Sequence, residues 1–171
     1  ESAAEVAMYR VKQDGRNGLR FFAPEMQAHT QRSLEIAASI KEAAHRGELR
    51  LVYQPQRALG SGALVGAEAL LRWHHPQWGL VSPAEFIPIA EQSGAILAID
   101  FWVIEAAARQ VRAWDAAGLP PIVVAVNVSA AQFARPQFVD ELLQVLRRLD
   151  VSPRRLEVEL TEAVALKYPE Q

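Results

Sequence analysis

The 171-residue sequence contains no cysteine. This absence excludes disulfide bonds, zinc sites built from thiolates and cysteine nucleophiles, and it fits a reducing compartment. The chain also lacks any apolar run near the ~18 residues that a membrane-spanning helix needs. Residues 1–5 have neither the basic nor the apolar region of a signal peptide. We therefore expect no membrane contact from this segment.

An excess of basic residues is also missing, because 18 Lys and Arg face 20 Asp and Glu, for a net charge of -2. Proteins that wrap a nucleic-acid polymer usually present a basic face, since phosphate neutralisation dominates their affinity. No such polymer is expected as a partner, although a small anionic ligand needs only one or two cations. The composition, 50% hydrophobic and 22% charged, is typical of a globular domain.

The first 22 residues predict a short helix, a turn and a strand. The turn is indicated by Asp14-Gly15-Arg16-Asn17-Gly18, since Gly and Asn tolerate positive φ. So short a piece cannot bury a core of its own. Because the sequence also lacks an initiator Met, we expect residues 1–22 to belong to a longer chain. They would complete a domain that lies upstream, or pack on the residues after position 22.

Residues 23–47 predict a helical linker. Ile36, Ile40 and Ala44 recur every four residues and so share one face of a helix. Gly47 is a typical residue at which such a helix ends. The linker could be a solvated connector or could transmit a signal, and the pattern does not distinguish the two.

From Glu48 onward, strands alternate with helices. The predicted strands begin at Leu49, Leu64, Ile122 and Leu156, and end at Pro55, Trp73, Val128 and Thr161. Helices are predicted after Ser82-Pro83, around the stripe Val103, Ala107, Val111 and Trp114, and over Phe138–Leu149. This alternation favours a largely parallel sheet with helical crossovers, either open and doubly wound or part of a β/α barrel.

Four polar residues interrupt these apolar strands: Glu68, Asn127, Glu157 and Glu159. A buried carboxylate without a partner costs several kcal/mol. The carboxyl ends of strands converge in β/α folds, and two carboxylates with an amide offer the hard oxygen ligands that Mg²⁺ or Mn²⁺ prefer. Arg72 falls on the same strand face as Glu68, where a guanidinium is suited to clamp a phosphate.

Other interpretations of these residues stay open. A strand Glu is often paired with a neighbouring Lys or Arg, Asn127 could merely cap its strand, and Glu157 could be the residue that pairs within the core. His74 and His75 are adjacent, so on a strand they point to opposite faces and cannot chelate one ion together.

Six segments then resemble the EAL domain family, in its order and spacing: Leu51–Gln56, Gly66–Trp73 with the signature Glu68-Ala69-Leu70, His75-Pro76, Ser82–Glu91, Ala125–Ser129 and Glu159–Glu162. Upstream, residues 7–17 are similar to the last segment of a GGDEF domain. The resemblance implies an α/β fold, the first half of a TIM-like (β/α)8 barrel of the EAL type whose first strand runs antiparallel. It divides the chain into a GGDEF remnant (1–22), a helical linker (23–47) and the N-terminal portion of an EAL domain (48–171).

The family resemblance further implies a bacterial cyclic di-GMP phosphodiesterase that uses Mg²⁺ or Mn²⁺ and yields linear pGpG in second-messenger signalling. Family enzymes use two metals that activate a water for in-line attack on phosphorus. Carried over to this sequence, the metal ligands are Glu68 (also catalytic), Asn127 and Glu159, the substrate-binding residues are Gln54 near a guanine and Arg72 on a phosphate, and the loop-stabilising residue is Glu162.

The family's later motifs, an Asp-Asp pair, a catalytic Lys and a further Glu, would lie beyond Gln171. We therefore expect the 171 residues alone to be inactive, with the missing groups supplied by the parent protein or by another chain. Two further hypotheses stay open: a degenerate EAL domain that senses cyclic di-GMP without cutting it, and a scaffold that neither binds nor cuts. We also expect a cytoplasmic location, free or as the cytosolic part of a membrane-anchored signalling protein, and a homodimer formed through EAL domains.

Overall fold

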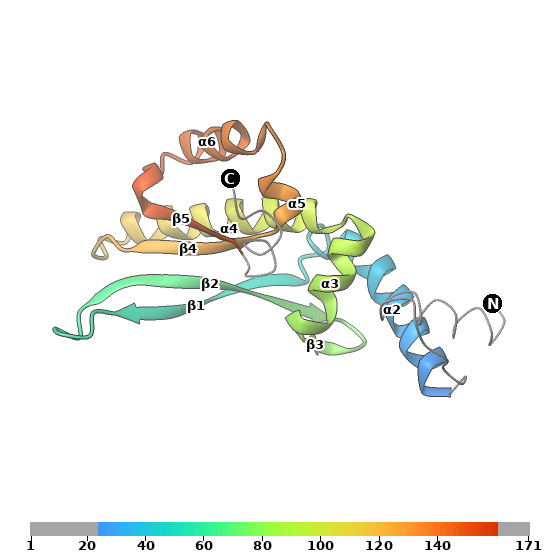
Figure 1. Ribbon diagram of the computed structural model, residues 1–171. Coiled ribbons are helices and arrows are strands. Elements are labelled where there is room, and N and C mark those ends of the chain that lie inside the picture. Colours follow the sequence, from blue (N-terminus) through green and yellow to red (C-terminus); the bar gives the residue numbers. More distant parts are fainter. Residues whose placement is uncertain (1–23, 161–171) are drawn as a thin grey trace.

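The computed structural model describes residues 24–160, with side chains from Gln31 onward (Figure 1). The elements in chain order are α2 (Pro24–Ala43), β1 (Leu49–Arg57), β2 (Leu64–His75), β3 (Gly79–Val81), α3 (Pro83–Ser93), α4 (Ile96–Ala116), β4 (Val123–Val128), α5 (Ala130–Phe133), α6 (Phe138–Arg148), a 3-10 turn (Pro153–Arg155) and β5 (Leu156–Leu160). The predicted GGDEF remnant and Glu162 lie outside the described residues.

The strands form one sheet in the order β1-β2-β4-β5, with β3 paired to β2. β1 runs antiparallel to β2, whereas β2, β4 and β5 are parallel to one another. The helical connections after β2 and β4 make these parallel pairings possible, because two parallel strands need a crossover between them. The sheet thus has the alternating α/β organisation and the antiparallel first strand that were predicted.

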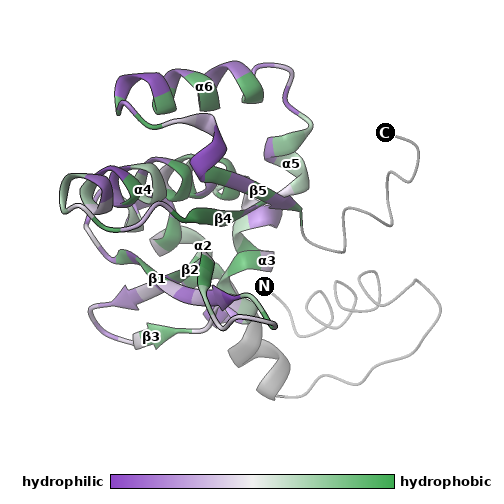
Figure 2. Cartoon of the chain, turned by 90° about the vertical axis from the view of Figure 1, so that its left-hand side faces the viewer, coloured by the Kyte–Doolittle hydropathy of each residue, from purple (hydrophilic) through white to green (hydrophobic). Residues whose placement is uncertain are grey.

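One face of the sheet carries the hydrophobic core. Val124 and Val126 of β4 are fully buried, as are Ala107 and Val111 of α4. α4 contacts both β4 and β1, and α6 packs against α4 in turn. Figure 2 shows β4 as almost uniformly hydrophobic, whereas β1 carries hydrophilic segments. Burial of these side chains on one face leaves the alternate positions of each strand to the opposite face.

The prediction that Pro55 ends the first strand is wrong, because β1 continues to Arg57. Among the described strands β1 lies at the edge of the sheet. A proline there removes no ladder hydrogen bond if its nitrogen faces away from the neighbouring strand. At Gly47 the prediction is confirmed, since this residue follows α2 with φ of 68°, a conformation that glycine adopts without strain.

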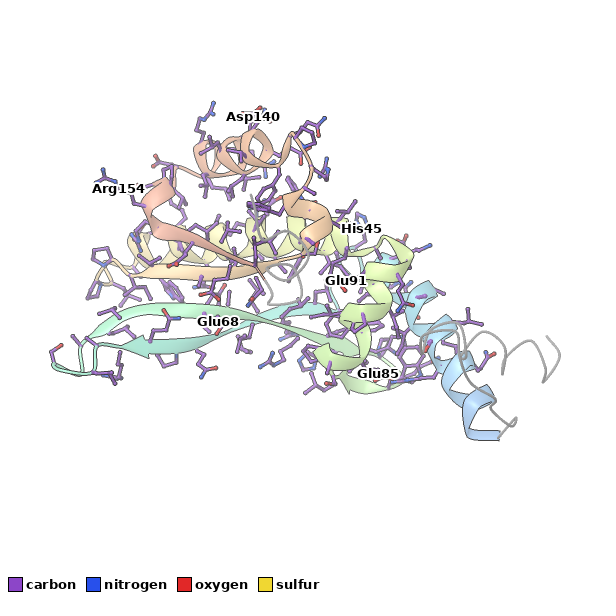
Figure 3. All side chains as sticks on the ribbon, in the orientation of Figure 1. His45, Glu68, Glu85, Glu91, Asp140 and Arg154 are labelled. Carbon is purple, nitrogen blue, oxygen red and sulfur yellow. The ribbon has the colours of Figure 1, made fainter. Side chains whose placement is uncertain are left out.

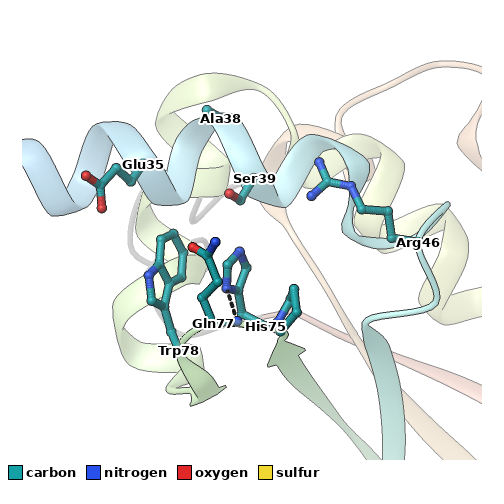
Figure 4. A pocket seen from close by; sticks show the side chains of 8 residues that line it. Glu35, Ala38, Ser39, Arg46, His75, Gln77 and Trp78 are labelled. Atoms are coloured by element: carbon teal, nitrogen blue, oxygen red, sulfur yellow. Dashed lines mark hydrogen bonds between the residues drawn. The ribbon is translucent and has the colours of Figure 1, made fainter.

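Helix α2 packs on the loop that follows β2. The guanidinium of Arg32 lies 4.2 Å from the ring centroid of Trp78 and its Nε donates to Glu85 Oε1 at 2.9 Å. Trp78 stacks on the ring of His75, which is buried and is the last residue of β2. A cavity of about 470 Å³ lies between α2 and this loop, and Figure 4 shows Glu35 and Arg46 on its rim.

One short strand, β3, was not predicted from the sequence pattern. β3 is only three residues long, and it is positioned by pairing with the end of β2, where Trp73 faces Val81. Buried Trp73 donates from Nε1 to Glu48 Oε2 at 2.9 Å.

In the part of the chain that the structure describes, no helix is both long and apolar enough to cross a membrane.

At Gly66, β2 closely approaches its neighbours β1 and β4. A Cβ at this position would lie 2.8 Å from Gln56 Oε1 and 3.0 Å from the backbone oxygen of Val123. Gly66→Ala is expected to lower the free energy of unfolding by about 1–3 kcal/mol, the usual cost of overpacking. Gly60→Ala is the matched control, because nothing lies within 4 Å of a Cβ there. Equal denaturant midpoints for the two variants would contradict this packing.

Candidate active site

The face of the sheet opposite the core is polar. Alternation along β1, β2, β4 and β5 brings the following side chains to it, here called the polar face: Gln54, Glu68, Arg72, Asn127, Glu157 and Glu159. Glu68, Asn127 and Glu159 are half-buried. In a strand buried on its other side, this face is the place where polar groups avoid the hydrophobic core.

Strand register brings the predicted site residues into neighbouring positions. Gln54 lies directly across from Glu68 in the antiparallel pair of β1 and β2. Glu159 lies directly beside Asn127 in the parallel pair of β4 and β5. Glu68 is in register with Ala125, two residues before Asn127, so the amide and this carboxylate are diagonal neighbours.

A hydrogen bond joins two of the predicted metal ligands. Asn127 Nδ2 donates to Glu68 Oε1 at 2.8 Å, although the residues lie 59 positions apart in the sequence. In Figure 3, Glu68 lies between the ribbons of β2 and β4. The bond fixes the plane of the amide, so that Asn127 Oδ1 and the second oxygen of Glu68 stay available as ligands.

Arg72 lies on the same face, toward the carboxyl end of β2. Its Nη1 donates to the carbonyl oxygen of Leu71 at 2.8 Å. A guanidinium carries five N–H donors, and this is the one hydrogen bond of its side chain to residues that the structure describes. The remaining donors can therefore bind an anionic group at the edge of the polar face.

The structure also bears on the competing interpretations of these carboxylates. Within residues 31–160, no Lys or Arg forms an ion pair with Glu68 or Glu159. Glu157 is exposed on the polar face, where it sits beside Ala125, and it does not pair within the core. His74 and His75 do point to opposite faces, one exposed and one buried.

The oxygen donors of the polar face fit a divalent metal in kind. Two carboxylates and one amide from three neighbouring strands suit Mg²⁺ or Mn²⁺, which prefer hard oxygen ligands. Among the described residues, no three His, Cys, Asp or Glu side chains gather closely enough to hold a metal. The ligand set Glu68, Asn127 and Glu159 agrees with this finding, because Asn127 is not one of those four residue types. A complete metal coordination shell would need further oxygen atoms from elsewhere.

A cavity of about 240 Å³ adjoins the carboxyl ends of β2 and β4. Arg72, Asn127 and Ser129 line it on the sheet side, and Asp100 lines it from α4. Asp100 is buried, and its Oδ2 accepts hydrogen bonds from both the backbone N–H and the hydroxyl of Ser129. Asp100 could not be singled out from the sequence, since one Asp in an amphipathic helix carries no distinguishing pattern.

Burial raises the pKa of Asp100 to about 6. The two hydrogen bonds from Ser129 oppose this shift, and the nearby charge of Glu91 adds to it. No Lys or Arg within the described residues forms an ion pair with this carboxylate. The site therefore holds a carboxylate whose ionisation costs free energy at neutral pH.

This shift has a testable consequence for stability. Since the folded pKa of Asp100 lies above its unfolded value of 3.8, the folded state keeps a proton that the unfolded state releases. The contribution of Asp100 to stability is therefore full below about pH 4 and is lost as pH rises through about 6. Asp100→Asn removes this dependence.

Thermal unfolding of wild type and Asp100→Asn between pH 4 and pH 7.5 measures the effect. The asparagine variant should gain on wild type as pH rises, by roughly 1–3 kcal/mol in total, from a shift of about two pKa units. A difference between the two proteins that stays constant with pH would contradict the raised pKa.

Comparisons with known proteins agree with this architecture. The EAL domain profile matches residues 37–171. The bifunctional diguanylate cyclase/cyclic di-GMP phosphodiesterase MucR of Pseudomonas aeruginosa is 42% identical over 164 residues, which are 96% of this chain and 24% of that protein. The oxygen sensor protein DosP of Escherichia coli is 37% identical over 167 residues, 98% of this chain and 21% of that protein.

Solved structures show the same fold. The MucR phosphodiesterase in complex with c-di-GMP superposes with a TM-score of 0.74 at 40% identity, covering 80% of this chain and 55% of that one. The EAL domain of Xanthomonas citri FimX in complex with c-diGMP gives 0.71 at 26% identity, covering 84% and 55%. The chain thus spans about half of these solved structures and less than a quarter of the two curated relatives. The sheet of this chain corresponds to part of the TIM-like barrel of these structures. The chain belongs to the EAL domain family.

Proposed function

We propose that this chain supplies the first part of the active site of a metal-dependent cyclic di-GMP phosphodiesterase, which hydrolyses the dinucleotide to linear pGpG. The observation that carries the proposal is the convergence of Glu68, Asn127 and Glu159 on one face of the sheet, with Asn127 hydrogen-bonded to Glu68. Family membership supports the same chemistry, since the related MucR carries phosphodiesterase in its name.

Three residues of the chain would hold the cation. Oxygen atoms of Glu68, Asn127 and Glu159 would bind it from three adjacent strands. A divalent metal bound there would supply Lewis-acid polarisation of the phosphoryl group and activation of a water. The hydrogen bond from Asn127 Nδ2 to Glu68 sets the amide oxygen and the carboxylate in a fixed relation before the ion arrives.

Arg72 and Gln54 would bind the dinucleotide. Beside the 240 Å³ cavity, Arg72 has guanidinium donors that no residue within 31–160 accepts, and a guanidinium recognises phosphate through paired N–H groups. Gln54 is exposed directly across from Glu68, where its amide can both donate to and accept from the edge of a guanine. Glu162, which would hold a loop over the site, lies outside the described residues.

The remaining groups would come from beyond this sequence, either later in the parent protein or from a second EAL domain in a homodimer. We further propose that residues 23–47 link an upstream GGDEF domain, ending in residues 1–22, to the EAL portion from residue 48. The contacts of Arg32 with Trp78 and Glu85 support a linker that is packed against the EAL portion rather than free.

Substitution of the carboxylates tests the proposal. In the full-length protein, Glu68→Ala or Glu159→Gln should lower kcat by roughly 100-fold or more, as removal of one electrostatic group does in other active sites. The fold should stay intact, because both residues lie on the polar face. pGpG formation is followed by chromatography and folding by circular dichroism.

Glu157→Gln is the matched control for Glu159→Gln. Both residues lie on β5 and on the same face, two positions apart, but Glu157 is exposed and in register with Ala125 instead of Asn127. Its kcat should stay close to wild type. If Glu157→Gln loses activity and Glu159→Gln keeps it, the ligand assignment on β5 is wrong.

Metal removal separates hydrolysis from binding. Treatment of the full-length protein with EDTA should abolish turnover, and Mg²⁺ or Mn²⁺ should restore it. Binding of cyclic di-GMP without turnover at saturating metal would instead favour the sensor, in which the site holds the dinucleotide and does not cut it. Absence of both binding and turnover would leave only the scaffold.

Arg72 has a separable role. Arg72→Ala should raise KM for cyclic di-GMP by about 10-fold or more, because a charged hydrogen bond to phosphate contributes on the order of 1.5–3 kcal/mol. The affinity for Mn²⁺ should stay the same, since Arg72 is not among the oxygen donors. An unchanged KM would show that another cation binds the phosphate.

A further inference from the structure

Three hydrogen bonds that involve a side-chain atom meet at Ser129, two residues beyond Asn127. Its backbone N–H donates to Asp100 Oδ2 at 3.0 Å, and its hydroxyl donates to the same oxygen. Its Oγ also accepts from the backbone N–H of Gln132 at 3.2 Å, which caps the N-terminus of α5. The carboxyl end of β4 is thus tied both to α4 and to the helix that comes next in the chain.

This arrangement costs stability, which makes a purely structural explanation unattractive. Asp100 and Ser129 are only 5% and 6% exposed, and the carboxylate forms no ion pair with a described Lys or Arg. A buried charge without a cation is usually less stable than a neutral group of the same shape. Burial raises the pKa of Asp100 for the same reason.

Ser129, at the carboxyl end of β4, lies close in sequence to Asn127 on the polar face. Val128 is the one residue between Ser129 and Asn127, and its side chain is buried in the core. Asn127, Ser129 and Asp100 line the same 240 Å³ cavity. A shift of Ser129 would therefore turn the backbone of Asn127, and with it the amide that donates to Glu68.

We propose that Asp100 is a positioning residue: through Ser129 it fixes the carboxyl end of β4 and so holds the Asn127 amide in the orientation that metal binding requires. Asp100 acts from helix α4 through Ser129 and is not one of the three proposed metal ligands. The proposal rests on the proposed function, because it assigns a role toward the same metal site. Groups that orient ligands in this way typically change metal affinity by about 10–100-fold when they are replaced.

The test is Mn²⁺ affinity in the full-length protein without substrate, measured from the electron paramagnetic resonance signal of free Mn²⁺. Asp100→Asn and Ser129→Ala should each bind Mn²⁺ about 10-fold more weakly. At saturating Mn²⁺, kcat should recover, and KM for cyclic di-GMP should match wild type. At pH 7.5, Asp100→Asn should melt no lower than wild type, so that weaker binding cannot come from unfolding.

Ser93→Ala is the control, because Ser93 also donates one side-chain hydrogen bond, to Ala90 O at the end of α3, away from β4. The proposal is overturned if Asp100→Asn and Ser129→Ala bind Mn²⁺ as tightly as Ser93→Ala while wild type binds and turns over substrate. It is also overturned if melting temperature and Mn²⁺ affinity fall together and excess Mn²⁺ restores nothing. A wild type that binds no Mn²⁺ would instead defeat the proposed function and this inference with it.

Discussion

The alternation of side chains along parallel strands is the constraint on which the rest of the molecule depends. Each strand must give one set of side chains to the core under α4, and Val124 and Val126 do so completely. The other set of side chains then faces away from the core, and the strand register determines which residues become neighbours on that face. Because β2, β4 and β5 are parallel neighbours, polar residues from distant parts of the chain gather on one face without any long loop.

The sequence allowed much of this architecture to be predicted, and the reason is periodicity. The near-continuous apolar run ending at Asn127 indicated a buried parallel strand. Glu68 and Glu159 stood out as candidate site residues because they are polar and lie inside apolar strands. Strand order and register could not be predicted from periodicity, since they depend on contacts between residues far apart. The neighbouring placement of Asn127 and Glu159 therefore emerged only from the pairing of β4 with β5.

Other features escaped prediction because tertiary contacts decide them. β1 continues past Pro55, which an edge position tolerates and a central strand would not. β3 exists through pairing with the end of β2 beside Trp73, and three residues are too few to show a period. Asp100 belongs to a helix pattern in which a single carboxylate is ordinarily solvated, and only its burial against Ser129 distinguishes it.

The site consequently depends on elements from both sides of the sheet. Hydrogen bonds within the polar face set Asn127 against Glu68, while α4 holds the end of the same strand from the core side. Helix α2 contacts the same edge of the sheet, since Arg32 stacks on Trp78 next to the carboxyl end of β2, the strand that carries Glu68. Contacts along the carboxyl edge of the sheet thus involve α2, α4 and the strands that carry the oxygen donors.

The most direct test of the central claim is the position of Mn²⁺ in crystals of the full-length protein, located by its anomalous scattering. The account predicts a peak on the polar face within coordination distance of oxygen atoms from Glu68, Asn127 and Glu159. A peak bound by other residues, or a polar face without Mn²⁺ in a protein that hydrolyses cyclic di-GMP, would contradict it.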